Sequence, residues 1–578
     1  MFFSCARVSA DAVGRMIRRR ACVTALLASC AGLSAPAAFC ADLPFWTPPA
    51  PAAAYRWEGG YFGANVGYLH GTGGFGLTGF PANGFSALIP PIPPITRATV
   101  NDVVEGVQAG YLHQIGALVI GFEQDVILGT PTVVTSASGT ASGAPYALTQ
   151  QQTINWMATM RARVGFAPND QFLLYATGGL AVGGVTTGST LAFFPPGGVA
   201  YLGGRNDFRV GWAAGAGVEY ALTSQFSATL EYLHVDLGHV TVAGIPNFAV
   251  DFEVHTDANL SADIVRAGIN YRFDRDGSDF QREVGRYMPQ FARSLDTEIG
   301  LRYWYSTGSI AKDLYGFSGA TLLSRLTYDG LGASSGEGFV RINDHSGFFV
   351  KGYIGAGAVT TGSLKDEDFP PGINPYSATT SAQRDGNLFY LSGDAGYDFW
   401  TGRDYKLGAF VGFFHERELV NAHGCAQVAS NPFICKPAIP DPILGITEDA
   451  RWFAARVGLS GEVTLWNRLR LGADAAWLPY AALISTDAHW LRMQSFDGNF
   501  IGPVREDGKG FTGVQLEAIV SYLISPDFSV GVGARYWRME TNGHAHFEDD
   551  IYGGGGGPQP IHFVSERYGG FLQAAFKF

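Results

Sequence analysis

The chain has 578 residues, of which 39 are basic and 51 acidic, so its formal net charge is −12. Charged residues make up only 16% and aromatic residues 13%, and no apolar run is long enough for a transmembrane helix, which needs about 20 residues. This composition excludes a disordered chain, a coiled coil and a helical membrane protein, and the acidic balance argues against nucleic-acid binding. A chain rich in glycine and aromatic residues but poor in charge is typical of a β-rich membrane protein.

The beginning of the chain predicts export. Residues 1–40 have the order of a secretory signal, with three arginines at 18–20 followed by a short apolar stretch over 21–29. Small residues at 38 and 40 suit cleavage after Cys40. The stretch before Met16 is long for a signal, so Met16 is an alternative start. A lipoprotein signal ending at Cys30 is a further alternative.

Two cysteines remain after the predicted signal. Cys425 and Cys435 lie close together in a segment that we expect to be a loop. Exported proteins mature in an oxidising compartment, and this spacing does not suit a metal site. The pair is therefore predicted to form a disulfide.

The first half is predicted to be a barrel of eight strands. After a Pro-rich periplasmic lead over 41–57, apolar residues recur with period two. In 151–166, for example, Trp156 faces opposite to Arg161. This periodicity predicts a domain over 58–273. Its eight strands are about 58–70, 103–115, 117–128, 151–166, 171–186, 206–222, 225–238 and 262–273.

The connections of this half alternate between tight turns and long loops, as in outer-membrane barrels, with the tight turns expected on the periplasmic side. Eight strands enclose a lumen that side chains fill, so a wide pore is not expected. The charged residues expected to pair inside it are Glu123, Arg161, Arg163, Glu219, Glu231 and Arg266. A proton or ion path is the alternative interpretation of this cluster.

The first half also resembles a known family. The resemblance rests on the opening "ADLPFWTPPAPAAAYRWEGGYFGANVGY", on "GVEYALTSQFSATLEYLHVDLG" and on the closing "VRAGINYRF", which ends at Phe273. These motifs are similar to those of the small eight-stranded porin-like outer-membrane proteins of Gram-negative bacteria. The resemblance implies residence in the outer membrane, with lipid, lipopolysaccharide and the barrel assembly machinery as partners.

The second half is predicted to be a barrel of ten strands. A polar stretch over 274–294 is interpreted as a periplasmic connector, and the domain that follows covers 295–578. Its strands are about 297–314, 322–343, 347–358, 388–400, 405–422, 451–465, 468–490, 511–524, 528–545 and 561–578. The predicted fold class is all-β, with two tandem transmembrane antiparallel β-barrels. One pore of 18 strands is the alternative.

Two acidic groups fall in the outward loops of the second barrel. Asp366 and Asp368 lie in the second outer loop, and Asp487 and His489 lie at the top of the seventh strand. Two crowded carboxylates can hold and polarise a water, and a carboxylate beside an imidazole can orient it as a general base. Taken alone, each group is also what a solvated acidic patch looks like.

The facing of the second group is not fixed by the pattern. Simple alternation from Leu469 and Trp477 places Asp487 and His489 on the lipid side. Pro479 interrupts this alternation.

The second half resembles the omptins, ten-stranded outer-membrane proteases. The motifs that carry the resemblance are "TEIGLRYWYSTGSIAKDLY", "LLSRLTYDGL", "LKDEDF", "YKLGAFVGF", "STDAHW" and "GVGARYW". It implies that Asp366 and Asp368 hold the attacking water, and that Asp487 orients His489, the base. It further implies cleavage of exposed peptides, often after basic residues, and a requirement for bound lipopolysaccharide.

The specificity pocket departs from that pattern. The two positions that carry acids in the family are Ser485 and Lys312 here. These two departures predict a substrate preference that differs from the family's, and a non-proteolytic relative is the alternative.

Three functions remain open: a surface endopeptidase, a structural or porin-like protein, and an adhesin. No catalytic metal or other cofactor is expected. His544 and His546 share a face and could hold a metal, but a polar loop is the simpler interpretation.

Overall fold

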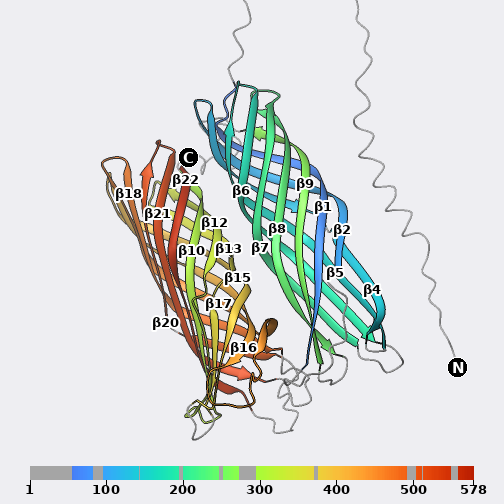
Figure 1. Cartoon of the computed structure of the whole chain (residues 1–578). Helices are drawn as coiled ribbons and strands as arrows, with labels where there is room; N and C mark the ends of the chain where they lie inside the picture. Colours follow the sequence, from blue (N-terminus) through green and yellow to red (C-terminus); the bar gives the residue numbers. More distant parts are fainter. Residues whose placement is uncertain are drawn as a thin grey trace, which may run out of the picture. The chain divides into compact units, whose positions relative to one another are not determined.

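The computed structural model describes residues 55–577 apart from 82–95, 130, 142–143, 194–199, 247–251, 273–294, 370–374, 491–502, 511 and 548–556. Among the described residues no helix is long and apolar enough to cross a membrane. Two antiparallel sheets account for nearly all of the regular structure (Figure 1). The predicted signal, the first part of the lead and the connector lie outside the described residues, as do Phe273 and Phe578.

The first sheet closes on itself as a barrel. Its strands are β1 (Gly59–Pro81), β2 (Thr96–Ile115), β3 (Leu118–Leu128), β4 (Thr132–Ala141), β5 (Ala144–Phe166), β6 (Phe172–Phe193), β7 (Ala200–Ala221), β8 (Phe226–Pro246) and β9 (Phe252–Arg272). β1 pairs with β9, and β3 and β4 pair one after the other with β5. Because β3 and β4 together take the place of one strand, the barrel has the eight strand positions that the periodicity predicts.

The second sheet closes in the same way. Its strands are β10 (Leu295–Tyr315), β11 (Leu322–Asp329), β12 (Ala333–Asp344), β13 (Phe348–Val359), β14 (Ser363–Asp368), β15 (Ser377–Thr401), β16 (Tyr405–Gln427), β17 (Ile439–Leu465), β18 (Leu469–His489), β19 (Val504–Gly510), β20 (Thr512–Leu523), β21 (Phe528–His546) and β22 (Gln559–Lys577). β10 pairs with β22. Three pairs of consecutive strands each take one strand position in the barrel: β11 with β12, β13 with β14, and β19 with β20. The barrel therefore has ten strand positions. The predicted fold class is confirmed, and the single 18-stranded pore is wrong.

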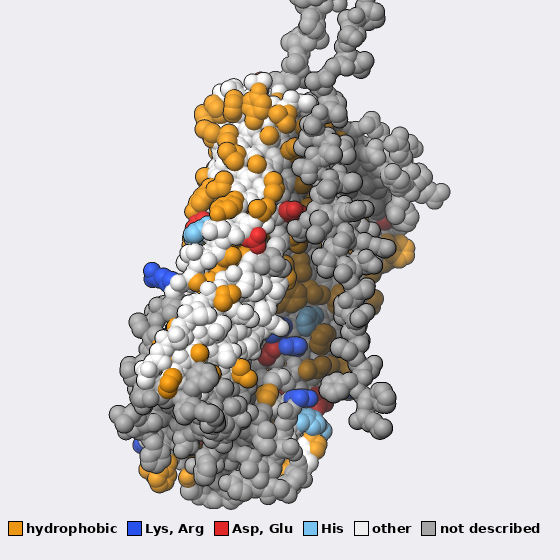
Figure 2. Space-filling model, turned by 90° about the vertical axis from the view of Figure 1, so that its right-hand side faces the viewer, with side chains coloured by type: hydrophobic (Ala, Val, Ile, Leu, Met, Phe, Trp, Pro, Cys, Tyr) orange, Lys and Arg blue, Asp and Glu red, His pale blue; other side chains and the backbone are white. Residues whose placement is uncertain are grey.

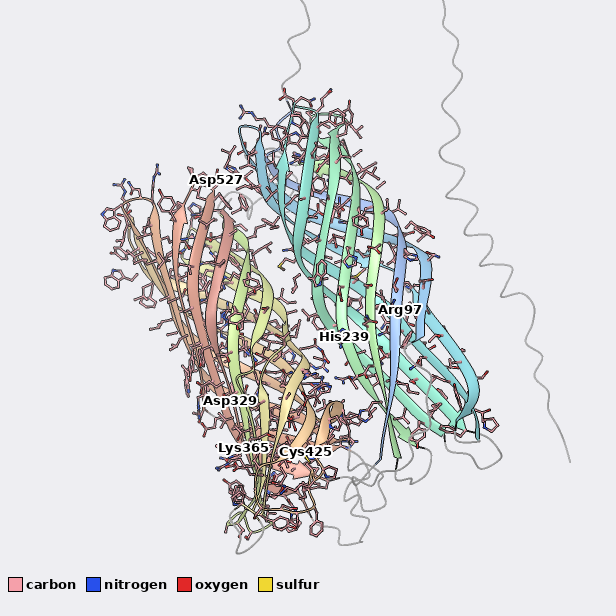
Figure 3. All side chains as sticks on the ribbon, viewed as in Figure 1. Arg97, His239, Asp329, Lys365, Cys425 and Asp527 are labelled. Carbon is pink, nitrogen blue, oxygen red and sulfur yellow. A yellow bond between two sulfur atoms is a disulfide. The ribbon has the colours of Figure 1, made fainter. Side chains whose placement is uncertain are left out.

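The strands extend further than predicted at the end with the long connections. β14 and β19 lie in segments that we expected to be outer loops. Antiparallel hairpins keep gaining backbone hydrogen bonds as they lengthen, so the ladders continue beyond the apolar band. Asp366 and Asp368 are therefore strand residues and not loop residues. In Figure 3, Asp329, Lys365 and Cys425 lie at the end of the second barrel opposite Asp527, which occupies a tight turn.

Each barrel presents apolar side chains outward along alternate positions. On β1, Phe62, Val66 and Tyr68 are about half exposed, whereas Tyr61 and Leu69 are buried. Figure 2 shows hydrophobic side chains gathered over the upper part of the visible surface, with charged and histidine side chains further down. A water-facing sheet would not expose such a band, whereas a lipid-facing barrel requires it.

Ion pairs fill the lumen of the first barrel, as predicted. The guanidinium of Arg161, which has no exposed surface, lies 2.6 Å from Glu123, 2.6 Å from Asp125 and 3.0 Å from Glu231. Arg266 contacts the same three carboxylates at 2.7–3.3 Å. Other ion pairs of the network join Arg163 to Glu123 and Glu219, and Arg272 to Glu219.

Aromatic rings fill the middle of the second barrel. Trp304, Tyr390 and Trp537 are almost fully buried, and their ring centroids lie 4.7–5.4 Å apart. Arg535 stacks near Trp304 and pairs with Glu517 at 2.6 Å. Rings and paired charges therefore occupy this part of the lumen.

Candidate active site at the outer end of the second barrel

A bulge decides which way the end of β18 faces. The register of β17 and β18 shifts between the pairs Ala455–Tyr480 and Val457–Trp477, so β18 carries one extra residue around Pro479. Trp477 and Tyr480 are consequently both exposed, although they are three positions apart. Beyond the bulge, alternate positions face inward in the opposite phase to the lower part of the strand.

Asp487 and His489 therefore point into the barrel and not into lipid. Asp487 is 4% exposed and Ile484 is 56% exposed. The Nε2 atom of His489 lies 3.1 Å from Oδ2 of Asp487. The placement that simple alternation gives is wrong, because the bulge at Pro479 reverses the phase.

Asp366 and Asp368 lie on the inward face of β14. Asp366 is 8% exposed and shares this face with Leu364, whereas Lys365 and Glu367 form an outward ion pair at 2.7 Å. Counted around the barrel from β10, β14 takes the third strand position and β18 the seventh, so the two strands lie on opposite sides of a ten-stranded barrel.

The strand register brings the two acidic groups to one level of the lumen. Leu326 of β11 is the register partner of both Lys312 on β10 and Asp366 on β14, and the ammonium group of Lys312 lies 2.6 Å from Asp487. The structure thus directs the four predicted residues toward one end of one lumen.

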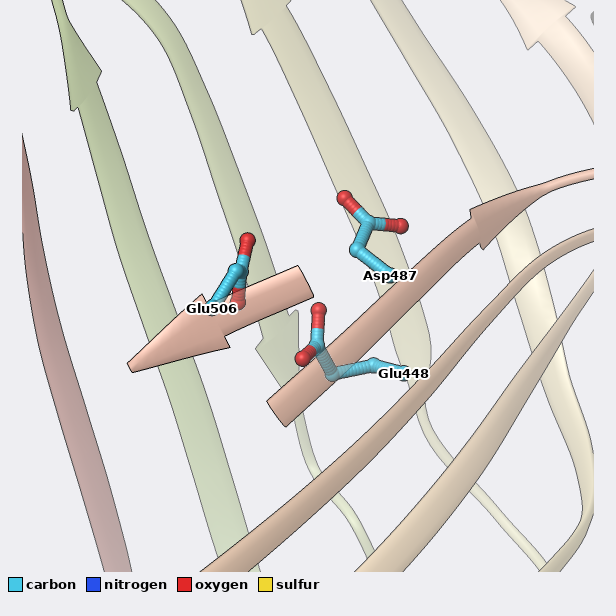
Figure 4. Close-up of side chains that lie close together, drawn as sticks. All are labelled: Glu448, Asp487 and Glu506. Carbon is cyan, nitrogen blue, oxygen red and sulfur yellow. The ribbon is translucent and has the colours of Figure 1, made fainter. Parts of the chain in front are cut away.

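A lysine occupies the centre of this end of the barrel. Nζ of Lys312, on β10, lies 2.6 Å from Asp487, 2.9 Å from Glu448 of β17 and 2.8 Å from Glu506 of β19. Figure 4 shows the three carboxylates converging from their strands. Ser485 donates a hydrogen bond from its hydroxyl to Glu448. The two predicted pocket residues, Lys312 and Ser485, therefore contact the same glutamate.

Sequence reasoning missed Glu448 and Glu506. Neither shares a local sequence motif with the predicted site residues, because each lies on a strand of its own. Glu448 is the register partner of Asp487, and Glu506 is the register partner of Ser485. Only the strand register could have identified them.

This cluster lies outside the apolar band of the barrel. At the height where the band ends, outward-facing residues of β16 and β17 are charged, and Arg417 pairs with Asp449 at 2.8 Å. The outward neighbours of Glu506 are Arg505 and Asp507, both exposed. A row of charged side chains cannot face hydrocarbon, so Lys312 and its carboxylates stand at or beyond the outer membrane surface.

Burial and charge together set the protonation of the cluster. Burial opposes ionisation of Asp487, but His489 and Lys312 outweigh it and hold the pKa of Asp487 below its usual range. Burial raises the pKa of Glu448 well above its usual range, and the neighbouring carboxylates add to this against the opposing effect of Lys312. The pKa of Glu506 is raised in the same way, first by burial. The pKa of Lys312 is raised although burial opposes it, because three carboxylates surround the ammonium group.

The three carboxylates have the arrangement of a cation site. One oxygen from each of Glu448, Asp487 and Glu506 lies within 4.8 Å of the others, the one such group found among the described residues. Carboxylate oxygens at this spacing suit a hard cation. Here the cation is the ammonium group of Lys312. His546, a predicted alternative metal ligand, instead lies 2.7 Å from the exposed Asp507 on the outside of the barrel.

The predicted disulfide is present. Cys425 at the end of β16 is bonded to Cys435, and their Cα atoms lie 5.7 Å apart. The bond closes a short loop between β16 and β17, at the end of the second barrel where Figure 3 also labels Asp329 and Lys365.

Comparison with known proteins identifies the family. The model of the outer membrane protein beta-barrel domain matches residues 25–273. The 31 kDa outer-membrane immunogenic protein of Brucella melitensis is 32% identical over 253 residues, which cover 43% of this chain and 98% of that protein. The chain belongs to the outer-membrane β-barrel proteins. The 25 kDa outer-membrane immunogenic protein of Brucella canis is 28% identical over 41% of this chain and 91% of its own length.

Location in the outer membrane of a Gram-negative bacterium is thereby confirmed for this outer-membrane β-barrel protein. Among solved structures, the outer membrane protease OmpT from Escherichia coli covers 50% of this chain and 97% of its own, at 14% identity and a TM-score of 0.41. This structural similarity is too low to indicate an activity. The omptin resemblance of the second barrel stays a prediction.

Proposed function

We propose that the second barrel is a surface endopeptidase that hydrolyses peptide bonds with an activated water. The observation that carries the proposal is the contact between His489 and Asp487, 3.1 Å long, on the inward face of the outer end of the barrel. Asp366 and Asp368 occupy the inward face of a strand on the opposite side of the lumen. The resemblance to omptins supports the same four residues.

In this proposal His489 is the general base. It takes a proton from water while the oxygen bonds to the peptide carbonyl carbon, and Asp487 stabilises the imidazolium that forms. Asp366 and Asp368 hold the water. When the C–N bond breaks, the proton passes from His489 to the leaving amine, so no acyl-enzyme forms.

The test is cleavage of a peptide library by the refolded chain with lipopolysaccharide present. General-base catalysis contributes roughly 10²–10⁴ in rate, so His489→Ala and Asp487→Asn should each lose nearly all cleavage. His546→Ala and Asp507→Asn are matched controls, because they form a similar pair on the outer face, 2.7 Å long and about half exposed. Both controls should retain full activity.

The endopeptidase proposal fails if folded wild-type protein cleaves no peptide, or if His489→Ala cleaves as fast as His546→Ala. Folding is checked by the change in electrophoretic mobility on heating. An adhesive role of the outer loops would then be the next hypothesis, and it predicts ligand binding that survives in the His489→Ala variant.

For the first barrel we propose a structural role without conductance. The buried network around Arg161, Arg163 and Arg266 occupies its lumen and pairs each guanidinium with carboxylates. A porin-like function predicts discrete conductance steps in planar bilayers, whereas the filled lumen predicts none.

A further inference from the structure

At the outer end of the second barrel, three buried carboxylates surround the ammonium group of Lys312. Lys312 is 3% exposed, and Glu448, Asp487 and Glu506 are 0%, 4% and 3% exposed. The ammonium group has three N–H donors and lies within 2.6–2.9 Å of three carboxylates. Its hydrogen-bonding capacity is therefore fully used inside the pocket.

The carboxylates retain acceptor capacity that Lys312 does not use. Among the described residues, Oδ1 of Asp487 and Oε2 of Glu506 are buried and have no hydrogen-bond partner. Three carboxylates whose oxygens lie within 4.8 Å of one another also repel each other unless a cation stands between them. The geometry and the surplus of acceptors are those of a cation site, and the ammonium group of Lys312 occupies it.

We propose that Lys312 is a tethered cation that fills a three-carboxylate pocket, and that it thereby makes the neighbouring site accept uncharged rather than cationic side chains. The part about side-chain preference rests on the proposed endopeptidase function. A lysine or arginine of a peptide would have to displace a buried ammonium group that three carboxylates hold. An uncharged side chain meets no such competition, and Ser485, beside Glu448, adds no charge of its own.

The first experiment tests occupancy of the pocket without using activity. Tb³⁺ is titrated into the refolded full-length mature chain, and its luminescence is followed for wild type and for Lys312→Met. Removing the ammonium frees three carboxylates for a hard cation, so the affinity should rise by about tenfold or more. In the double variant Lys312→Met/Glu506→Gln, most of this gain should disappear.

Lys351→Met is the matched control. Lys351 is also an inward-facing lysine of the second barrel, but its ion pair is to a single carboxylate, that of Asp474, at 2.7 Å. This variant should bind Tb³⁺ no better than wild type. If Lys312→Met does not fold, Lys312→Met/Glu448→Gln removes one of the repelling charges and keeps two ligands.

Two results overturn the tethered-cation assignment. One is a folded Lys312 variant that binds Tb³⁺ no more tightly than Lys351→Met, and the other is wild-type protein that binds Tb³⁺ as tightly as Lys312→Met. In the peptide library, Lys312→Met should shift preference toward peptides with lysine or arginine, and an unchanged preference overturns the specificity role. If Tb³⁺ affinity rises but no form of the protein cleaves any peptide, the endopeptidase proposal fails and the assignment of Lys312 stands.

Discussion

Replacing Arg161 by methionine should destabilise the first barrel strongly. Its guanidinium is fully buried and contacts Glu123, Asp125 and Glu231 at 2.6–3.0 Å. Methionine fills a similar volume but leaves these three carboxylates to share Arg266, with a longer contact of 3.3 Å from Arg163 to Glu123. Removing one partner of a buried ion pair typically costs about 3–5 kcal/mol.

That loss should be visible in urea unfolding. With a slope of about 2 kcal/mol per molar urea, a loss of about 4 kcal/mol lowers the midpoint by roughly 2 M. Pulse proteolysis of the refolded chain, read by mass spectrometry, follows the peptides of each barrel separately. Arg97→Met, at an exposed position of β2 labelled in Figure 3, is the control and should stay within about 0.5 kcal/mol of wild type.

A second substitution tests the physical cause. Adding Asp125→Asn to Arg161→Met removes one of the uncompensated buried charges and should recover part of the lost stability. Equal midpoints for Arg161→Met and Arg97→Met would refute the view that the lumen network holds the barrel together. The cluster of charges would then be better explained as a proton or ion path.

Three further predictions concern the rest of the chain. Cys425 and Cys435 should not react with a maleimide before reduction, and reducing the bond should loosen the loop without unfolding the barrel, because it closes only a short loop. Relative to wild type, Glu448→Gln should become more stable as pH rises, because the folded-state pKa of Glu448 is raised. Such a carboxyl group favours folding below its unfolded pKa of about 4.3, and this contribution is lost as pH rises toward the folded-state pKa. A stability difference between variant and wild type that stays constant from pH 4 to 9 would contradict this. Residues 41–273 and 295–578 should each refold in detergent with a β-type circular dichroism spectrum, because each barrel closes through its own first and last strands, and failure of both fragments would contradict this.

The sequence by itself predicts both barrels and most of their strands. Side-chain facing in a strand follows from the local backbone, so a period of two can be recognised without knowing the partner strand. Tight turns such as the one at Asp527 mark the ends of the predicted strands, and these ends agree closely with the structure on the short-turn side. The same periodicity places Trp156 outward and Arg161 inward, and the structure confirms both.

Part of the candidate site depends on information that no local pattern contains. In the sequence Pro479 interrupts the alternation of this strand, but the inward facing of Asp487 follows only from the bulge that shifts the register of β18 against β17. Glu448 and Glu506 reach Lys312 from strands far apart in sequence, so their meeting depends on barrel closure and register. Register is a property of paired strands, and for that reason the tertiary structure alone decided which charges share the outer end of the second barrel.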